Sequence, residues 1–218
     1  MSTCLRIAIV AAVATAATGC WVGDPYTPPD DSGGGGLTIQ WSSRPEAIPS
    51  TPSSDRTIDR AVFRQDDLRL VGDAGTFPLD RDKLTWERGI VPTPLPVMGA
   101  APGLYSRLLF ELDGSDGSEE EYAYEITGTV KVNDTFQPFT IRDTSDLALS
   151  LEFSIMLTAG QSAIIPVRIE IDKMAGAVNF QSVSMVDGRY LVDKDSSQIS
   201  AVRAAVRDAI GVHDAVTQ

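Results

Sequence analysis

The residues best suited by type and spacing to bind a metal ion form one acidic cluster at positions 113–121. Carboxylate oxygens on a glycine-containing turn suit calcium. The spacing departs from that of an EF-hand loop, because Ser115 and Gly117 stand where the third and fifth positions need acids. We therefore favour a solvated acidic hairpin turn over a calcium site. If calcium binds, we expect it to bind weakly, with Asp113, Asp116 and Glu119 as candidate ligands.

Residues that could act as catalytic acids, bases or nucleophiles are scarce. His213 is the single histidine, and at the end of an amphipathic segment it suits a surface or capping role better than base catalysis. The sequence has no Gly-x-Ser-x-Gly elbow, no His-Glu-x-x-His pair and no phosphate-binding loop. Carboxylates are abundant, but a glycosidase needs two of them at a defined distance in space. We assign no catalytic residue and expect neither an enzyme nor a required cofactor.

Aromatic side chains could contact a sugar or a protein partner. Trp86 lies in the polar segment 82–88 beside a proline-rich stretch, which predicts an exposed indole ring. Trp41 is the second candidate. Tyr122 and Tyr124 fall on the apolar face of a predicted strand, so we expect both in the core. Trp41 and Trp86 are therefore the candidate ligand-contact residues.

The charge and the cysteines limit the class of partner. The chain has 30 acidic and 18 basic residues, and its formal net charge is −12. Nucleic acids and anionic membrane surfaces are bound through Lys and Arg, so this acidity opposes both as partners. The two cysteines are Cys4 and Cys20. The residues after them therefore have no thiol for a disulfide, a metal site or a nucleophile.

Positions 1–19 have the layout of a secretory signal peptide. Arg6 precedes an apolar run that is shorter than the roughly 18–20 residues of a membrane-spanning helix. The run ends in Ala17-Thr18-Gly19-Cys20, which resembles the lipobox of bacterial lipoproteins. That resemblance implies acylation of Cys20 and attachment of the protein to a lipid bilayer. An ordinary secretory signal, with Cys20 as a bystander, is the alternative.

The rest of the chain divides into a tether and one domain. Positions 20–36 contain the candidate lipidated cysteine, several prolines and four consecutive glycines, which predicts a flexible tether. Positions 37–218 are long enough to bury one core, so we expect a single domain there.

Alternation of apolar and polar residues predicts the strands of that domain. It runs over 104–112, 122–132, 147–157 and 165–171, with turn residues between these segments. Within 104–112 we place Leu108 on the buried face and Tyr105 on the opposite one. Positions 58–71 fit a strand that ends at Gly72-Asp73-Ala74-Gly75 or, over 57–66, a short helix. Positions 77–102 contain five prolines, which indicates irregular or edge structure.

A change of period predicts one amphipathic helix near the C-terminus, over about 196–212. Its apolar face contains Ile199, Val202, Val206, Ile210 and His213. Asp195 and Gln198 resemble a capping pair, and Gly211 is suited to the helix stop. We therefore predict a mainly β fold, an antiparallel β-sandwich in the style of immunoglobulin or transthyretin domains, closed by one C-terminal amphipathic helix.

Segment 103–174 resembles a family of secreted and lipid-anchored bacterial β-sandwich domains of unknown function. The matching residues are Gly103, Tyr105, Leu108, Tyr122, Tyr124, Leu151, Phe153, Gly160, Ile171, Asp172 and Lys173. The match covers about a third of the chain and follows the strand periodicity. It implies the sandwich fold, and the family has no assigned activity to carry over.

These features lead us to expect a lipid-anchored lipoprotein of the bacterial cell envelope that is a non-catalytic binding or assembly module. Trp21 follows Cys20 where an aspartate would favour the inner membrane, so we expect the outer membrane, with the domain facing the periplasm or the cell surface. The expected partners are the lipid bilayer, through Cys20, and an envelope protein or glycan. The alternative is a glycan-binding or glycan-cleaving envelope domain.

Overall fold

The computed structural model describes residues 36–51, 55–114, 122–213 and 216–217. Over these residues the chain is mainly β, and the predicted β-sandwich class is confirmed. The predicted signal peptide, Cys20 and all of the tether except Gly36 lie outside the described residues.

Seventeen elements form the described structure. The first eight strands are β1 (Leu37–Arg44), β2 (Arg56–Gly72), β3 (Gly75–Pro78), β4 (Lys83–Trp86), β5 (Leu95–Val97), β6 (Gly103–Leu112), β7 (Tyr124–Val132) and β8 (Thr135–Asp143). The later strands are β9 (Leu147–Leu157), β10 (Ala163–Glu170), β11 (Met185–Val186), β12 (Arg189–Val192), β13 (Ile210–Val212) and β14 (Val216–Thr217). The helices are α1 (Ile171–Gly176), the 3₁₀ turn η2 (Phe180–Ser182) and α2 (Ile199–Ala209).

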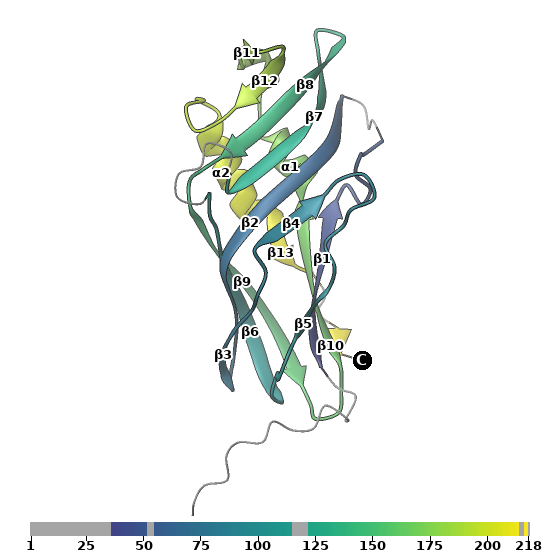
Figure 1. The fold of residues 1–218 in the computed structure, drawn as a ribbon, viewed down its shortest axis with the longest axis vertical. Helices are drawn as coiled ribbons and strands as arrows, with labels where there is room; N and C mark the ends of the chain where they lie inside the picture. Colours follow the sequence, from purple (N-terminus) through teal and green to yellow (C-terminus); the bar gives the residue numbers. More distant parts are fainter. Residues whose placement is uncertain (1–35, 52–54, 115–121, 214–215, 218) are drawn as a thin grey trace, which may run out of the picture.

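Strand β2 organises the larger sheet, whose order is β11-β12-β8-β7-β2-β6-β9. The first part of β2, up to Arg64, pairs with β7 and β4, and its second part, from Gln65, pairs with β6 and β3. Near the start of the second part the register with β6 shifts between Asp66 and Arg69, and Asp67 has a φ of 53°. Such a bulge bends a strand. One strand of 17 residues therefore belongs to both ends of an elongated molecule (Figure 1).

The smaller sheet has the order β13-β10-β1-β5, with β14 also paired to β10. β1 and β10 are parallel from Leu37↔Ala163 to Arg44↔Glu170, and β12 is parallel to β8. The prediction of an antiparallel sandwich is therefore wrong at these two pairs. Parallel neighbours need a long connection, and both pairs join strands that are far apart in the sequence. Strand periodicity gives no information about such distant pairing.

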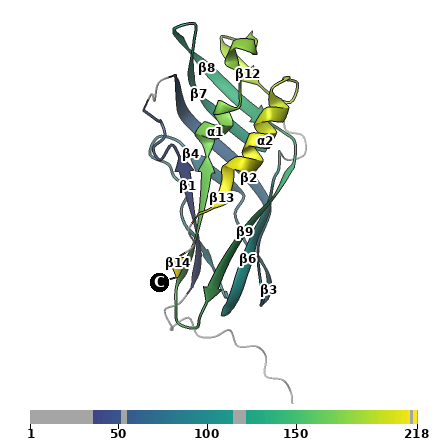
Figure 2. The ribbon, with the colours of Figure 1, turned by 180° about the vertical axis from the view of Figure 1, so that it is seen from behind.

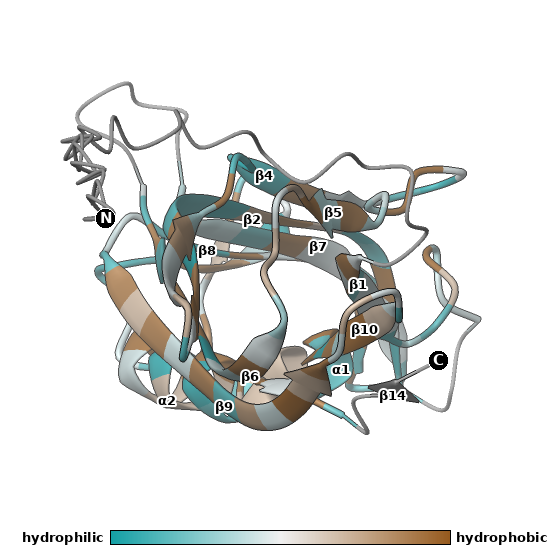
Figure 3. Ribbon diagram, turned by 90° about the horizontal axis from the view of Figure 1, so that it is seen from below, coloured by the Kyte–Doolittle hydropathy of each residue, from teal (hydrophilic) through white to brown (hydrophobic). Residues whose placement is uncertain are grey.

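We call the end of the molecule near Leu37 the proximal half. Leu37 pairs with Ala163, directly after the turn between β9 and β10 (Figure 1). Here the second part of β2, with β6 and β9, packs against the sheet that contains β1 and β10. Trp41 of β1 meets Phe110 of β6 edge to face, with ring centroids 6.2 Å apart. Figure 3 shows the alternation of hydrophobic and hydrophilic residues along β9 that seals this interior.

We call the opposite end, built from β7, β8, β11, β12 and the first part of β2, the distal half. Helices α1 and α2 cover one face of this sheet (Figure 2). Phe180 of η2 packs on Phe139 of β8 with ring centroids 5.0 Å apart. Arg203 of α2 donates hydrogen bonds of 2.6 and 2.9 Å to the two carboxylate oxygens of Asp143. The Tyr124 hydroxyl donates to the same carboxylate at 3.3 Å, so α2 is fixed to the ends of β7 and β8.

The C-terminal helix is shorter than predicted. α2 ends at Ala209, and β13 follows and pairs with β10. Gly211 therefore lies inside a strand and is not the helix stop. Asp195 is not the helix cap, because Gln198 occupies that position without a side-chain capping bond. The β-branched residues Ile210 and Val212 complete an edge of the smaller sheet, and this pairing prevails over the helical period.

Three local predictions also need correction. Ile171, predicted as the last residue of the strand 165–171, begins helix α1 instead, so the fold has more than one helix. Positions 57–66 form part of β2 and not a helix. Tyr105 is fully buried, because a register shift between Tyr105 and Arg107 changes which side chains face the core.

Candidate functional site

Neither predicted aromatic contact is exposed. Trp86 is 2% exposed and Trp41 is 5% exposed. Trp86 lies edge to face against Phe63, with ring centroids 6.1 Å apart. The four residues of β4 alternate, with Leu84 and Trp86 facing the core. The prediction of an exposed Trp86 is therefore wrong, and neither tryptophan offers its ring to a ligand, because both rings are buried. The charged residues next to Trp86 in the sequence do not share its inward-facing side of β4.

The candidate calcium ligands are only partly described. Asp113 directly follows β6, whereas Asp116 and Glu119 lie outside the described residues. Burial, and then a hydrogen bond with Asp146, raise the pKa of Asp113. Within the described ranges, no three His, Cys, Asp or Glu side chains are grouped so that they could hold a metal ion. Calcium binding at 113–121 therefore stays a prediction.

His213 does not lie at the end of the helix as predicted. It follows strand β13, and its backbone N–H donates to the carbonyl of Pro166 at 2.9 Å. The backbone at His213 thus continues the pairing of the smaller sheet. No described contact gives its imidazole a catalytic partner.

The face of the distal half that α1 and α2 leave uncovered is polar. The register of β7 and β8 sets Glu125 opposite Arg142 and Thr127 opposite Thr140. Residues between them, such as Ile126 and Ile141, are buried on the inner face. Pairing with β12 brings Leu191 beside Thr140. Alternation along three strands therefore groups hydroxyl and charged side chains on one surface.

A cavity of about 340 Å³ lies on this face, between β7, β8 and the β11–β12 hairpin, and we call it the Arg142 cavity. Its lining offers two guanidinium groups, two hydroxyl groups, two carboxylates and two apolar side chains. In that order they are Arg142 and Arg189, Thr127 and Thr140, Glu125 and Asp187, and Val186 and Leu191. This volume lies at the small end of the range of ligand pockets. The mixture suits reversible binding of a small polar ligand.

The charges around the Arg142 cavity are unequally compensated. Glu125 accepts a hydrogen bond from Arg60, which also donates to Glu87 at 3.1 Å. The Arg142 guanidinium lies over the Tyr122 ring, 4.6 Å from its centroid. Its buried Nε has no hydrogen-bond partner among the described residues. Arg142 is therefore held by an aromatic ring while the carboxylate opposite it is engaged by Arg60.

A second cavity of about 480 Å³ lies between the loop after β1 and helix α1. Arg56 lines it, with its guanidinium carbon 5.9 Å from the centre of the Phe180 ring. Burial lowers the pKa of Arg56, and the charges of Asp172 and Asp55 oppose that shift. Together with Glu46, these acids give the cavity three carboxylates for one guanidinium. Arg56 is thus compensated locally, which suits a structural role.

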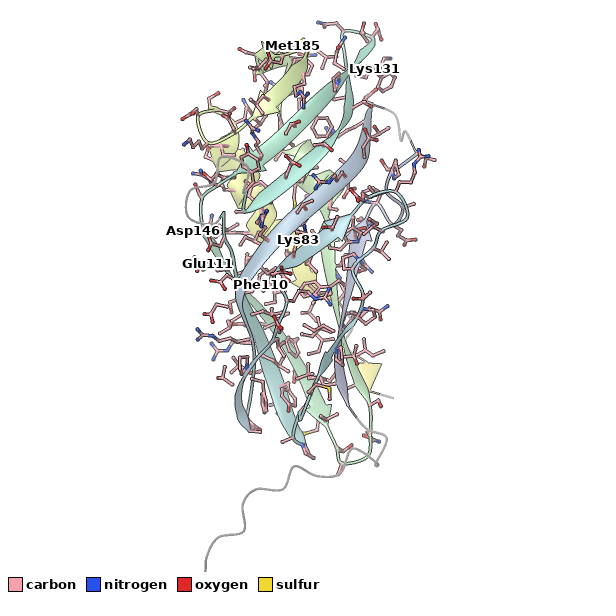
Figure 4. The ribbon with its side chains drawn as sticks, viewed as in Figure 1. Lys83, Phe110, Glu111, Lys131, Asp146 and Met185 are labelled. Atoms are coloured by element: carbon pink, nitrogen blue, oxygen red, sulfur yellow. The ribbon has the colours of Figure 1, made fainter. Side chains whose placement is uncertain are left out.

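The distal end of the molecule also exposes large apolar side chains. Phe136 is 48% exposed, Met185 is 46% exposed and Val186 is 45% exposed. Figure 4 shows Met185 and Lys131 at the same end, and Phe136 is the cross-strand partner of Lys131. Val186 also lines the Arg142 cavity. Single exposed apolar side chains are common on protein surfaces, and Met98 is more exposed than any of these three, so it is the position of Val186 beside the Arg142 cavity that makes this end a candidate recognition surface.

Sequence reasoning did not find the residues of this cavity. The predicted strand 122–132 placed Glu125 and Thr127 on a solvent-facing side, which the structure confirms. The strand that supplies Thr140 and Arg142 was not predicted. Its signal was the alternation of Phe139, Ile141 and Asp143 with these two residues, after the Asn133-Asp134 turn.

Comparisons with known proteins add no relative: no protein-family model, no curated protein and no solved structure matches this chain. The resemblance of segment 103–174 to secreted β-sandwich domains stays an expectation. In the described part of the chain, no helix is both long and apolar enough to cross a membrane.

Proposed function

We propose that this chain is a lipid-anchored lipoprotein of the bacterial cell envelope, attached through acylated Cys20, and that it is a non-catalytic binding or assembly module. Its recognition surface is the distal half. The outer membrane is the proposed location, with the domain facing the periplasm or the cell surface.

The observation that carries this proposal is the position of the two ends along the long axis. The described chain enters at the proximal end, where Leu37 pairs with Val97 and Ala163. The exposed side chains of Phe136, Met185 and Val186 and the Arg142 cavity belong to the distal half. A domain held at residue 20 through a tether would therefore present this surface away from the bilayer.

The tether and the net charge support the same function. A Gly- and Pro-containing segment at 20–36 gives reach without needing to fold. A net charge of −12 opposes close contact with anionic headgroups and with nucleic acid. The partner is then an envelope protein or a glycan that is bound at a distance from the bilayer.

The anchor is tested with the Cys20→Ser variant of the full chain. We expect it to lose incorporation of radiolabelled palmitate and to move from the membrane to the soluble fraction. Serine is small and polar like cysteine, so export is expected to continue. Unchanged membrane partition of the variant would contradict the anchor.

The recognition surface is tested by photo-crosslinking in the native envelope. A photoreactive amino acid is placed at Met185 in the distal half and, as the control, at Met98 in the proximal half. Met98 is 73% exposed and directly follows Val97, the partner of Leu37. We expect one dominant cross-linked species from position 185 and none from position 98. Equal cross-linking at both positions, or cross-linking only at 98, would contradict recognition at the distal end.

A specific observation favours glycan over protein as the ligand of the cavity itself. The Arg142 cavity is small and is lined by hydroxyl, guanidinium and carboxylate groups. Such groups match the hydroxyls and charged substituents of a single sugar unit.

A further inference from the structure

We propose that the Arg142 cavity binds the carboxylate of an acidic sugar, a uronic acid, and that Arg142 is the residue that selects for the carboxylate. This inference rests on the proposed function, because it names the ligand class of the same distal surface. It assigns no catalytic step.

The contacts of the Arg142 guanidinium group support a carboxylate ligand. On a two-stranded antiparallel pair, the residue opposite an arginine is its natural ion-pair partner. That residue is Glu125, which instead accepts from Arg60. Arg142 rests on Tyr122 and lines the cavity, while its Nε is buried and has no hydrogen-bond partner among the described residues. Because a guanidinium presents its donors as a planar fork, this arrangement is suited to receive a carboxylate.

The lining of the Arg142 cavity is less acidic than the chain as a whole. Arg142 and Arg189 both line it, and Asp187 is the single acid of its lining besides Glu125. The chain as a whole has 12 more acidic than basic residues. The second cavity, which Arg56 lines, shows the contrary arrangement, with three carboxylates and one guanidinium. Of these two cavities, the Arg142 cavity is the one that favours an anionic ligand.

The other residues that line the Arg142 cavity suit the sugar part of the ligand. Thr127 and Thr140 can both donate to and accept from sugar hydroxyls, and Asp187 can accept from them. Leu191 and Val186 form an apolar wall, which suits the C–H face of a pyranose ring. Thr140 is only 5% exposed and pairs with Leu191 of β12, so it forms a recessed part of the lining. A simple carboxylate such as N-acetylglycine would leave these hydroxyl-binding groups unused.

The test is a ligand-observed NMR titration of the full-length lipoprotein in detergent micelles with three probes. D-galacturonate has the carboxylate and the sugar hydroxyls, D-galactose lacks the carboxylate, and N-acetylglycine lacks the sugar. We expect galacturonate to bind at least tenfold more tightly than either other probe. The Arg142→Gln variant should lose about tenfold in galacturonate affinity while its weak affinity for galactose stays unchanged.

The Arg107→Gln variant is the matched control, since Arg107 is exposed on β6 in the proximal half. It should bind all three probes as the unmodified protein does, and urea unfolding should confirm that both variants are folded. Equal binding of galactose and galacturonate would overturn selection by the carboxylate. Equal binding of N-acetylglycine and galacturonate would overturn the sugar. Absence of binding by every probe would overturn this inference, whereas the proposed function would fail separately, through the cross-linking at Met185.

Discussion

In the proximal half a sheet packs on a sheet, whereas in the distal half helices α1 and α2 pack on one face of a sheet and leave the other uncovered. Apolar contacts such as Trp41 on Phe110 seal the proximal interior. In the distal half, apolar packing is joined by a directional contact, the ion pair between Arg203 and Asp143. A helix can rotate or slide on an apolar surface, and an ion pair with two hydrogen bonds opposes that freedom.

This difference shows how one small fold separates its sealed core from the surface proposed for recognition. In the distal half the face opposite α2 remains open for polar side chains and for the Arg142 cavity. β2 runs through both halves, so they share one continuous backbone. We therefore expect the two halves to unfold together although they are built differently.

The largest effect is expected from removing a buried side chain in the core of the proximal half. Leu108 on β6 is fully buried, and the Leu108→Ala variant should lose about 2–5 kcal/mol of unfolding free energy. Urea unfolding measures this loss. Because β2 joins the halves, hydrogen exchange at Ile141 in the distal half should become faster as well. Unchanged protection of Ile141 would mean that the halves unfold independently.

The next largest effect is expected from removing the ion pair between Arg203 and Asp143 in the distal half. The Arg203→Met variant leaves Asp143, which is 1% exposed, without its cation. We expect a loss of about 2–3 kcal/mol, less than the roughly 3–5 kcal/mol of a fully buried pair, because the Arg203 side chain is 32% exposed. Arg207→Met on the exposed side of the same helix is the control. Equal losses in the two variants would show that the ion pair has no special weight.

A steric substitution tests how closely β2 and β7 approach in the distal half. A Cβ at Gly128 would lie 2.0 Å from the carbonyl oxygen of Thr57, which is a backbone atom and can move only with its strand. Gly128→Ala should therefore cost about 1–3 kcal/mol in thermal or urea unfolding. At Gly176 the nearest atom to a new Cβ is 3.5 Å away, so Gly176→Ala is the matched control. A Gly128→Ala protein as stable as the control would contradict this close approach.

The smallest expected effect is a change in how the stability of the protein depends on pH. Burial raises the pKa of Asp143, but hydrogen bonds from Arg203 and Ser145 outweigh it, and the pKa lies below the ordinary value. A depressed folded-state pKa contributes stability above the unfolded pKa of roughly 4, and this contribution is lost as the pH falls through the folded value. In Arg203→Met, burial without the cation should raise this pKa and reverse the slope. Urea midpoints between about pH 2 and 7, a range that spans the unfolded pKa, measure both slopes, and equal slopes in the two proteins would contradict the assignment.

The two halves also differ in how far the sequence predicted them. In the proximal half, the long alternation from Leu147 to Leu157 indicated β9 and its buried face. The bulge at Tyr105 was not predictable, since a register shift depends on the neighbouring strand. Trp86 was misassigned because the charged residues around it lie outside the inward-facing side of the short strand β4, while Trp86 itself points inward.

In the distal half, the features that matter are contacts between segments far apart in the sequence. Asp143 and Arg203 are 60 residues apart, and no local pattern joins them. The cavity needs β12 beside β8, which is a parallel pairing that periodicity does not specify. The solvent-facing side of β7 was predictable from the sequence, whereas the strands that complete the cavity beside it were not. Sequence therefore indicated the surface on which the site lies but not the residues that complete it.

The parallel pairing of β1 with β10 has a mechanical consequence. If residues 20–36 tether the domain and the distal half binds a partner, as proposed above, a pull along the long axis enters the described residues at Leu37. β1 runs along that axis with β10 on one side and β5 on the other. A pull on its first residue therefore shears the hydrogen bonds of β1 together and does not peel them apart one at a time. The first strand of the described domain therefore lies in the orientation in which a strand best resists a pull along its axis.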